Sequence, residues 1–240
     1  MSINRRTRAS KWWACAAVVV ISALAGCGGN DGHKTHAKAT SSARGRTAAH
    51  GGGGGGQNAR PADCRTDDSD QEKPTASPKD LYWKPDGTSL VPMSKSAGPL
   101  KFDGPVWYCF AHTPMGAVLA VHAITDHFGY PRWREVVERQ LVPGPGRDAF
   151  IAERSRQTEK PGSGQLEGGG YAGFSVLAYN KKEATVMVLV RMPNAEQYGS
   201  LSATVRWQDG DWKVLPDSHG AVYSGGSHVD GTNGFVTWES

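Results

Sequence analysis

The sequence has no hydrophobic run long enough to span a membrane. Its apolar run at residues 12–24 has about 13 residues, whereas a helix that crosses the bilayer core needs about 20. This excludes a permanent transmembrane helix there. A basic segment at residues 5–11 precedes the run and small residues follow it, which is the order of a cleaved secretory signal.

Residues 24–27 read Leu-Ala-Gly-Cys and resemble the bacterial lipobox. The resemblance implies cleavage before Cys27 and attachment of a diacylglyceryl group to its thiol. Two acyl chains give stable anchoring where one chain is marginal. We therefore expect residues 1–26 to be a signal peptide and the protein to be held on the outer face of the cytoplasmic membrane. The alternative is a secreted protein with an unmodified Cys27.

Cysteine is scarce, with four residues in 240. Cys15 leaves with the signal peptide and Cys27 takes the lipid, so Cys64 and Cys109 remain. Disulfides persist outside the cytoplasm, and we predict that these two are bonded. Closing a loop of this length stabilises a domain by roughly 3 to 4 kcal/mol in the chain-entropy model. Two free, buried thiols are the alternative.

The sequence also lacks an excess of basic residues where a domain would fold. The formal charge is +4, but residues 1–27 and 28–60 each carry a net +4, which leaves −4 for residues 61–240. A nucleic-acid-binding domain is instead strongly basic. We expect no nucleic-acid partner.

Residues 27–62 are rich in Gly, Ser and Lys, include an unbroken glycine run at 51–56, and offer little to bury. This composition predicts a disordered tether that precedes an α+β domain at residues 63–240. Basic residues in the tether favour contact with anionic lipid, and a plain soluble linker is the alternative. His33, His36 and His50 have no repeated ligand spacing, so a metal-binding tail is not favoured.

Catalytic motifs are absent as well. The sequence has no His-Glu-x-x-His pair, no Gly-x-Ser-x-Gly elbow and no glycine loop placed between a strand and a helix. His122 is close to helical spacing with Asp126 and His127, but forms no metal motif with them. Asp209 and Asp211 are assigned to a tight turn. We expect no enzyme activity, no cofactor and no metal.

The first half of the domain has helical patterns. Residues 63–105 alternate polar turns with short apolar pieces, which predicts an extended leader. Residues 104–111 have strand composition. Thr113 as N-cap and Pro114 as first residue then predict a helix that ends near Phe128 and is apolar around much of its circumference. Two further helices are predicted, from Trp133 to before Pro143 and over 148–157.

The second half has strand patterns. Residues 170–179, 183–192 and 200–208 are rich in β-branched and aromatic residues, and 183–192 alternates apolar and polar positions. Asp209-Gly210 is a strong hairpin signal that joins the third run to residues 211–215. Helices followed by an antiparallel sheet define an α+β fold.

The Thr-Pro-Met-Gly-Ala-Val-Leu-Ala helix start at 113–120 and the Trp-Gln-Asp-Gly-Asp-Trp hairpin at 207–212 resemble those of a family of uncharacterised actinobacterial lipoproteins. The element order is also similar to the nuclear transport factor 2-like cone, a fold of extracellular subunits of conjugation machines. That resemblance implies helices packed on a bent antiparallel sheet and a pocket or contact surface between them. The candidate lining residues are Tyr171, Phe174, Trp207 and Trp212, with packing in the core as the favoured alternative for each.

These features predict a membrane-anchored extracytoplasmic lipoprotein. Its domain is expected to bind another envelope protein without catalysis, in a conjugation or secretion assembly. A small-ligand-binding lipoprotein that uses a pocket in the cone is the main alternative, and a hydrolase is a third.

Overall fold

The computed structural model describes residue 60 and residues 63–87, 89–157, 170–193 and 197–238. The predicted signal peptide, Cys27 and all of the predicted tether except Arg60 lie outside the described residues. Within the described part of the chain, no helix is long and apolar enough to cross a membrane.

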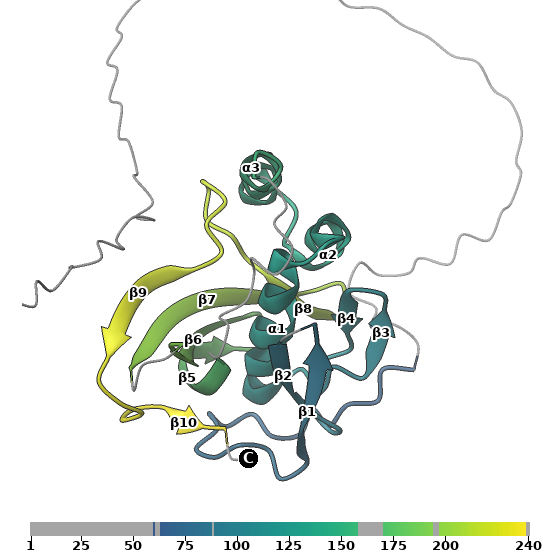
Figure 1. The fold of residues 1–240 in the computed structure, drawn as a ribbon. Coiled ribbons are helices and arrows are strands. Elements are labelled where there is room, and N and C mark those ends of the chain that lie inside the picture. The colour runs from purple at the N-terminus through teal and green to yellow at the C-terminus, as the bar shows by residue number, and fades with distance from the viewer. Residues whose placement is uncertain (1–59, 61–62, 88, 158–169, 194–196, 239–240) are drawn as a thin grey trace, which may run out of the picture. The chain divides into compact units, whose positions relative to one another are not determined.

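A six-stranded antiparallel sheet forms one layer of the fold (Figure 1). Four strands follow one another in space in the order β5-β6-β7-β8, β10 pairs with β5, and β9 pairs with β7. The strands are β5 (Gly170–Asn180), β6 (Glu183–Arg191), β7 (Tyr198–Gln208), β8 (Asp211–Val214), β9 (Ser224–Val229) and β10 (Val236–Thr237).

The predicted alternation along β6 is confirmed. Ala184, Val186 and Val188 are buried, and their cross-strand partners on β7 include the buried Val205 and Ala203. Successive side chains of a strand point to opposite faces, so this register turns one face of the sheet toward the core. The Asp209-Gly210 hairpin is also confirmed, with both residues at positive φ.

Helix α1 (Pro114–Asp126) is the central element of the domain. Thr113 Oγ1 accepts a hydrogen bond from the Gly116 N–H at 3.0 Å, and Pro114 is the first helical residue, as predicted. The helix ends two residues earlier than expected, because its last turn tightens into the 3₁₀ helix His127–Gly129. One side of α1 faces the sheet and another faces strand β2, so it is buried all round.

The predicted leader folds further than expected, into two antiparallel hairpins. These are β1 (Leu81–Asp86) with β2 (Ser89–Ser94), and β3 (Lys101–Asp103) with β4 (Val106–Tyr108). Val91 and Met93 of β2 are fully buried against the core that contains α1. The short apolar pieces of the leader are therefore strands that extend the core.

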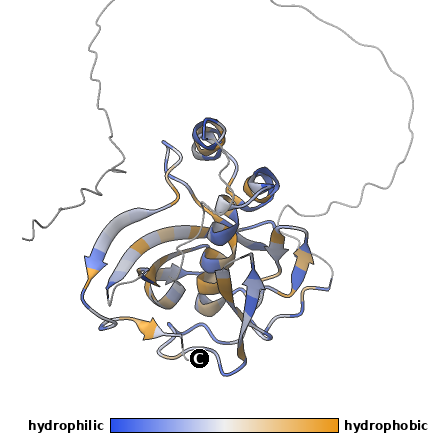
Figure 2. Cartoon of the chain, viewed as in Figure 1, coloured by the Kyte–Doolittle hydropathy of each residue, from blue (hydrophilic) through white to orange (hydrophobic). Residues whose placement is uncertain are grey.

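Two further helices follow α1. Helix α2 (Trp133–Gln140) lies where the sequence predicts it, whereas α3 (Pro145–Arg154) begins three residues before the expected start. Pro145 is tolerated in the first turn of α3, where its missing N–H has no helical acceptor. None of the residues of α3 is fully buried, and hydrophilic residues cover much of it (Figure 2). The class is α+β.

Candidate functional site

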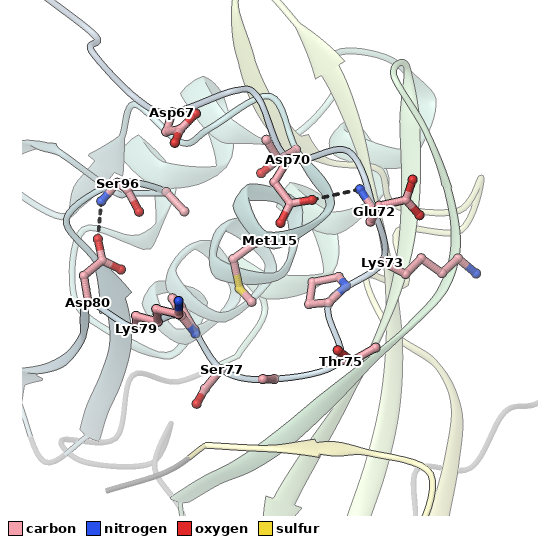
Figure 3. Close-up of a pocket in the computed structure, with 15 residues that line it drawn as sticks. Asp67, Asp70, Glu72, Lys73, Thr75, Ser77, Lys79, Asp80, Ser96 and Met115 are labelled. Carbon is pink, nitrogen blue, oxygen red and sulfur yellow. Dashed lines mark hydrogen bonds between the residues drawn. The ribbon is translucent and has the colours of Figure 1, made fainter.

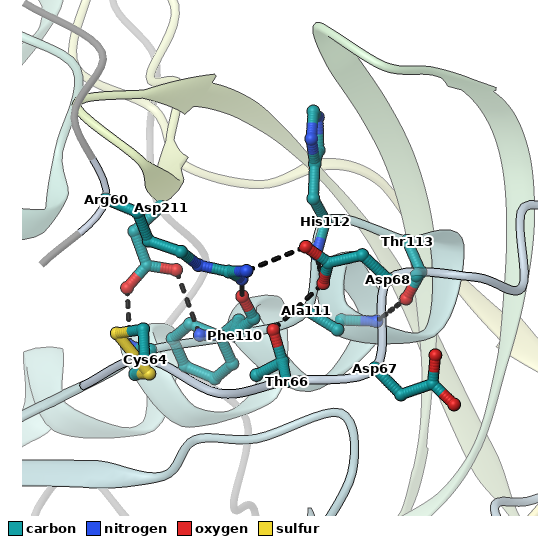
Figure 4. A network of polar contacts seen from close by, with 12 residues as sticks. Arg60, Cys64, Thr66, Asp67, Asp68, Phe110, Ala111, His112, Thr113 and Asp211 are labelled. Carbon is teal, nitrogen blue, oxygen red and sulfur yellow. Dashed lines mark hydrogen bonds and ion pairs between the residues drawn. A yellow bond between two sulfur atoms is a disulfide. The ribbon is translucent and has the colours of Figure 1, made fainter. Parts of the chain in front are cut away.

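Residues 63–80, the part of the leader that precedes β1 and the only part called the leader from here on, are fastened at one end by the Cys64–Cys109 disulfide (Figure 4). The prediction of this bond is confirmed, and the two Cα atoms lie 5.4 Å apart. Cys109 directly follows β4 and adopts φ of +73°, a conformation that few residues other than glycine take. The bond therefore holds the leader against the segment that leads into α1.

Asp68 is the second fastening point. Its Oδ1 accepts the His112 N–H at 2.8 Å and the Thr66 hydroxyl at 2.9 Å, and its Oδ2 pairs with Arg60 at 2.7 Å (Figure 4). Partial burial alone would raise the pKa of Asp68, but these donors outweigh it and the pKa is lowered. Arg60 also donates to the Phe110 carbonyl at 2.6 Å, so a residue of the predicted tether contacts the domain.

Asp211 accepts hydrogen bonds from the same segment. This corrects its assignment to the turn. Its carboxylate accepts the backbone N–H groups of Cys109 at 2.6 Å, Phe110 at 3.0 Å and Trp212 at 2.9 Å. Burial raises the pKa of Asp211 to about 6, against the lowering effect of the three donors. Only Asp209 serves the turn, where its carboxylate pairs with Lys213.

The other end of the leader is held by Asp80. Its carboxylate accepts the Ser94 hydroxyl and the Ser96 N–H, both at 2.7 Å. Burial would raise the pKa of Asp80, but the two serines lower it by more. The Asp67 N–H also donates to the Ser96 carbonyl at 2.9 Å. The leader is therefore fixed on both sides of residues 72–79.

Between these fastenings the leader borders a groove of about 610 Å³ (Figure 3). Figure 3 shows the Met115 side chain, from the first turn of α1, pointing into the ring that the leader forms. Thr113 and Ala97 add to the domain side, and residues 67–80 supply most of the other. The groove is open to solvent.

Three main-chain N–H groups on the leader side of the groove make no hydrogen bond within the described residues. Among the described residues, the N–H groups of Thr75, Ala76 and Ser77 have no hydrogen-bond partner. Thr75 and Ala76 are exposed, so water satisfies these groups in the free protein. A second chain that lies along the leader can replace that water with main-chain hydrogen bonds.

The groove is acidic. Four carboxylates lie on it, from Asp67, Asp70, Glu72 and Asp80, against two amines. One amine, that of Lys73, points away and donates to the Leu177 carbonyl of β5 at 2.9 Å (Figure 3). The lining contains no histidine, cysteine or arginine.

A family model for a domain of unknown function, DUF8175, matches residues 45–237. The chain belongs to this family. No curated protein and no solved structure matches it. The groove, its fastenings and the sheet all lie within the DUF8175 match, which also covers part of the predicted tether.

The structure places the four aromatic residues predicted to line a pocket at two separate points of the DUF8175 domain. Phe174 and Trp212 are at most 1% exposed and pack in the core, so they have no free surface for a ligand. Tyr171 packs beside His122, and Trp207 stacks on His112 with ring centroids 3.9 Å apart. Sequence reasoning missed the groove, because its residues are the Asp, Ser, Pro and Lys that are typical of turns.

One group of described side chains outside the groove has the residue types of a metal site. Possible ligand atoms of Asp86, Asp126 and His127 lie within 4.8 Å of one another. The prediction of no metal rested on the absence of a His-Glu-x-x-His pair and on the spacing of His122 from Asp126 and His127. Asp86 is distant in sequence from Asp126 and His127, and the β1–β2 hairpin brings it next to them.

Proposed function

We propose that this protein is a lipid-anchored extracytoplasmic protein that binds an extended, basic segment of another envelope protein. Its DUF8175 domain holds that segment in the leader groove and carries out no catalysis. The lipid on Cys27 keeps the domain at the outer face of the cytoplasmic membrane, within a conjugation or secretion assembly.

The unpaired N–H groups of Thr75, Ala76 and Ser77, which lie in and beside a bend of the chain, carry the proposal. An extended peptide gains affinity when its carbonyl groups accept hydrogen bonds from such groups, and specificity by placing side chains in adjoining depressions. Met115 supplies an apolar contact in the groove. Because Asp68 and Asp80 fix the leader on both sides, the partner meets a surface that is already ordered, which lowers the entropic cost of binding.

The charge of the groove specifies the partner segment. Four acidic residues line it against two lysines; the Lys73 amine is engaged by Leu177, and the Asp80 carboxylate by Ser94 and Ser96. Complementary charge steers association and disfavours partners of the wrong sign. The bound segment therefore carries lysine or arginine.

A small-ligand-binding protein is the second candidate, since 610 Å³ falls within the usual range of ligand pockets. Such pockets enclose most of the ligand, whereas this groove is open. The similarity to the nuclear transport factor 2-like cone places an alternative pocket between α1 and the sheet. That space holds packed side chains, including Phe174 and Val186, which favours the protein-binding function.

The groove proposal is tested by chemical crosslinking in intact cells followed by mass spectrometry. We expect a crosslinked basic segment of an extracytoplasmic protein, lost when Asp70 and Glu72 are both changed to Lys. The control is Asp230→Lys, an exposed charge reversal outside the groove, which should leave the adduct unchanged. Equal adducts in both variants would contradict the proposal.

The anchor is tested separately with radiolabelled palmitate. The wild type should incorporate label and fractionate with membranes, and Cys27→Ala should lose both properties. Undiminished labelling of Cys27→Ala would refute the lipid anchor without bearing on the groove.

A further inference from the structure

Asp86, Asp126 and His127 bring two carboxylates and an imidazole together beside the C-terminal end of α1. Asp86 is the last residue of β1, Asp126 ends α1, and His127 begins the following 3₁₀ helix. The His127 side chain is 4% exposed, and its Nε2 lies 2.9 Å from Asp86 Oδ2. The cluster therefore joins the β1–β2 hairpin to the central helix.

The tautomer of His127 is set by its other nitrogen. Nδ1 lies 2.6 Å from the Ala123 carbonyl, which accepts but cannot donate a hydrogen bond. Nδ1 therefore carries a proton, and Nε2 is left as the atom that faces the cluster. Metal-binding histidines are oriented in this way, by donating the remote N–H to a carbonyl.

Three buried atoms of the cluster lack hydrogen bonds. Asp86 Oδ2, Asp126 Oδ2 and His127 Nε2 are shielded from solvent, and none has an aligned partner. Asp86 Oδ2 lies close to Nε2 but off the direction in which a proton on Nε2 would point. Buried polar atoms are rarely left unpaired, and here three of them converge on one place.

The Tyr171 hydroxyl orients the Asp126 carboxylate. Tyr171 donates its hydroxyl proton to Asp126 Oδ1 at 3.1 Å, which leaves Oδ2 for the cluster.

We propose that Asp86, Asp126 and His127 bind a divalent metal ion of the zinc class. One nitrogen and two oxygen ligands suit Zn²⁺, whereas Ca²⁺ and Mg²⁺ favour oxygen alone. Two ligands at 2.0–2.2 Å from one ion lie roughly 2.8–3.6 Å apart for angles of 90–109°, and the Nε2–Oδ2 separation of 2.9 Å falls at the 90° end of that range. The ion links the β1–β2 hairpin to α1 and leaves its remaining coordination positions for water.

Zinc binding is measured by titration calorimetry on the full chain, stripped of metal with chelator and held in detergent. The tether histidines are first changed to Gln (His33, His36 and His50) in every sample, since they offer competing ligands. We expect one equivalent of Zn²⁺ to bind. Asp126→Asn and His127→Gln should each lower the affinity at least about 100-fold, more than the loss of an outer-shell partner.

Matched controls are Asp148→Asn and His219→Gln, which change the same residue types away from the cluster and should leave the affinity unchanged. Circular dichroism of the metal-free variants checks that they fold. Thermal unfolding gives a second readout. Zn²⁺ at a hundredfold excess over Kd should raise the Tm of the protein that carries only the tether substitutions by about 5 to 10 °C. It should not raise the Tm of the Asp126 and His127 variants.

The ligand set is checked on the unsubstituted cluster by X-ray absorption of the zinc-loaded protein. One nitrogen and at least two oxygen neighbours, with no sulfur, are expected. Absence of saturable binding would mean that a proton on Nε2 alone balances the cluster, and would overturn the proposal. Unchanged affinity in the Asp126 and His127 variants, or a different ligand set, would also overturn it.

Discussion

At the scale of single residues, the Asp211 carboxylate has more backbone hydrogen bonds than its place next to a hairpin would require. It is 8% exposed and accepts three backbone N–H groups, two of them from the segment that holds the disulfide. Burial raises its pKa to about 6 in the folded protein, compared with 3.8 for a free side chain. The folded state therefore keeps a proton that the unfolded chain releases between these values.

This predicts a loss of stability as the pH rises. Because the folded state binds more protons between pH 4 and 6, the contribution of Asp211 falls across that window and is then constant. Relative to Asp211→Asn, which does not titrate, the wild type should lose about 2 kcal/mol of unfolding free energy from pH 4 to pH 7. Urea unfolding at both pH values measures the difference. Asp209→Asn, at the exposed turn, is the control and should show no such change.

His122 should give a pH dependence of the opposite sign. It is fully buried in α1 between the rings of Tyr171 and Trp238, and burial lowers its pKa to about 4 despite the bond to the Val118 carbonyl. The unfolded chain takes up a proton near pH 6.5 and the folded state does not. Stability is therefore lost as the pH falls below 6.5.

Substitution of His122 by Phe removes this titration and keeps a ring. Relative to His122→Phe, the wild type should lose about 2 kcal/mol between pH 7 and pH 5 in the same unfolding assay. A constant difference between the two proteins would show that His122 is protonated in the folded state.

The separate roles of Asp209 and Asp211 in their hairpin were only partly predictable from the sequence. The Asp-Gly pair indicates the turn, since both residues can adopt positive φ. Nothing local to Asp211 indicates that its carboxylate binds Cys109 and Phe110, about a hundred residues away. The same holds for Asp86, which reaches Asp126 and His127 only because β1 folds back on β2.

At the scale of secondary structure, the start of α1 depends on close packing as well as capping. A Cβ on Gly116 would lie 1.9 Å from the Ala111 carbonyl oxygen, which is a backbone atom that cannot move alone. Ala111 is also held by the Trp212 indole N–H, which donates to its carbonyl at 2.9 Å. Gly116 is therefore required by the approach of the preceding segment to the helix.

Gly116→Ala should destabilise the protein even though alanine is the better helix former by about 1 kcal/mol. Overpacking against fixed backbone costs typically about 1 to 3 kcal/mol and should prevail, giving a net loss of up to about 2 kcal/mol. Urea unfolding tests this. Gly231→Ala is the control, because a Cβ there meets nothing within 4 Å. A more stable Gly116→Ala protein would show that the helix start does not pack against Ala111.

Elements were predictable where local chemistry and packing agree. Thr113-Pro114 and the alternation in β6 specify their elements without help from the rest of the chain. The β1–β2 hairpin was missed because Pro85 and Pro92 interrupt its apolar runs and argue against strands. A two-stranded sheet tolerates them, since each strand has only one neighbour.

At the scale of the whole molecule, the predicted lipid anchor on Cys27 would tether a DUF8175 domain that has an ordered, acidic groove. The disulfide, Asp68 and Asp80 fix the leader, so the groove exists before any partner arrives. Residues 158–169, and all of the predicted tether except Arg60, lie outside the described residues.

The most direct test is photo-crosslinking in intact cells from a single position in the groove. A photoreactive phenylalanine analogue replaces the exposed Thr75 in the full chain, with Asp230 as the position outside the groove. The account predicts one protein adduct from position 75, mapped to an extracytoplasmic segment that carries lysine or arginine, and none from position 230. An adduct from position 230 with the same partner, or no protein adduct from position 75, would contradict it.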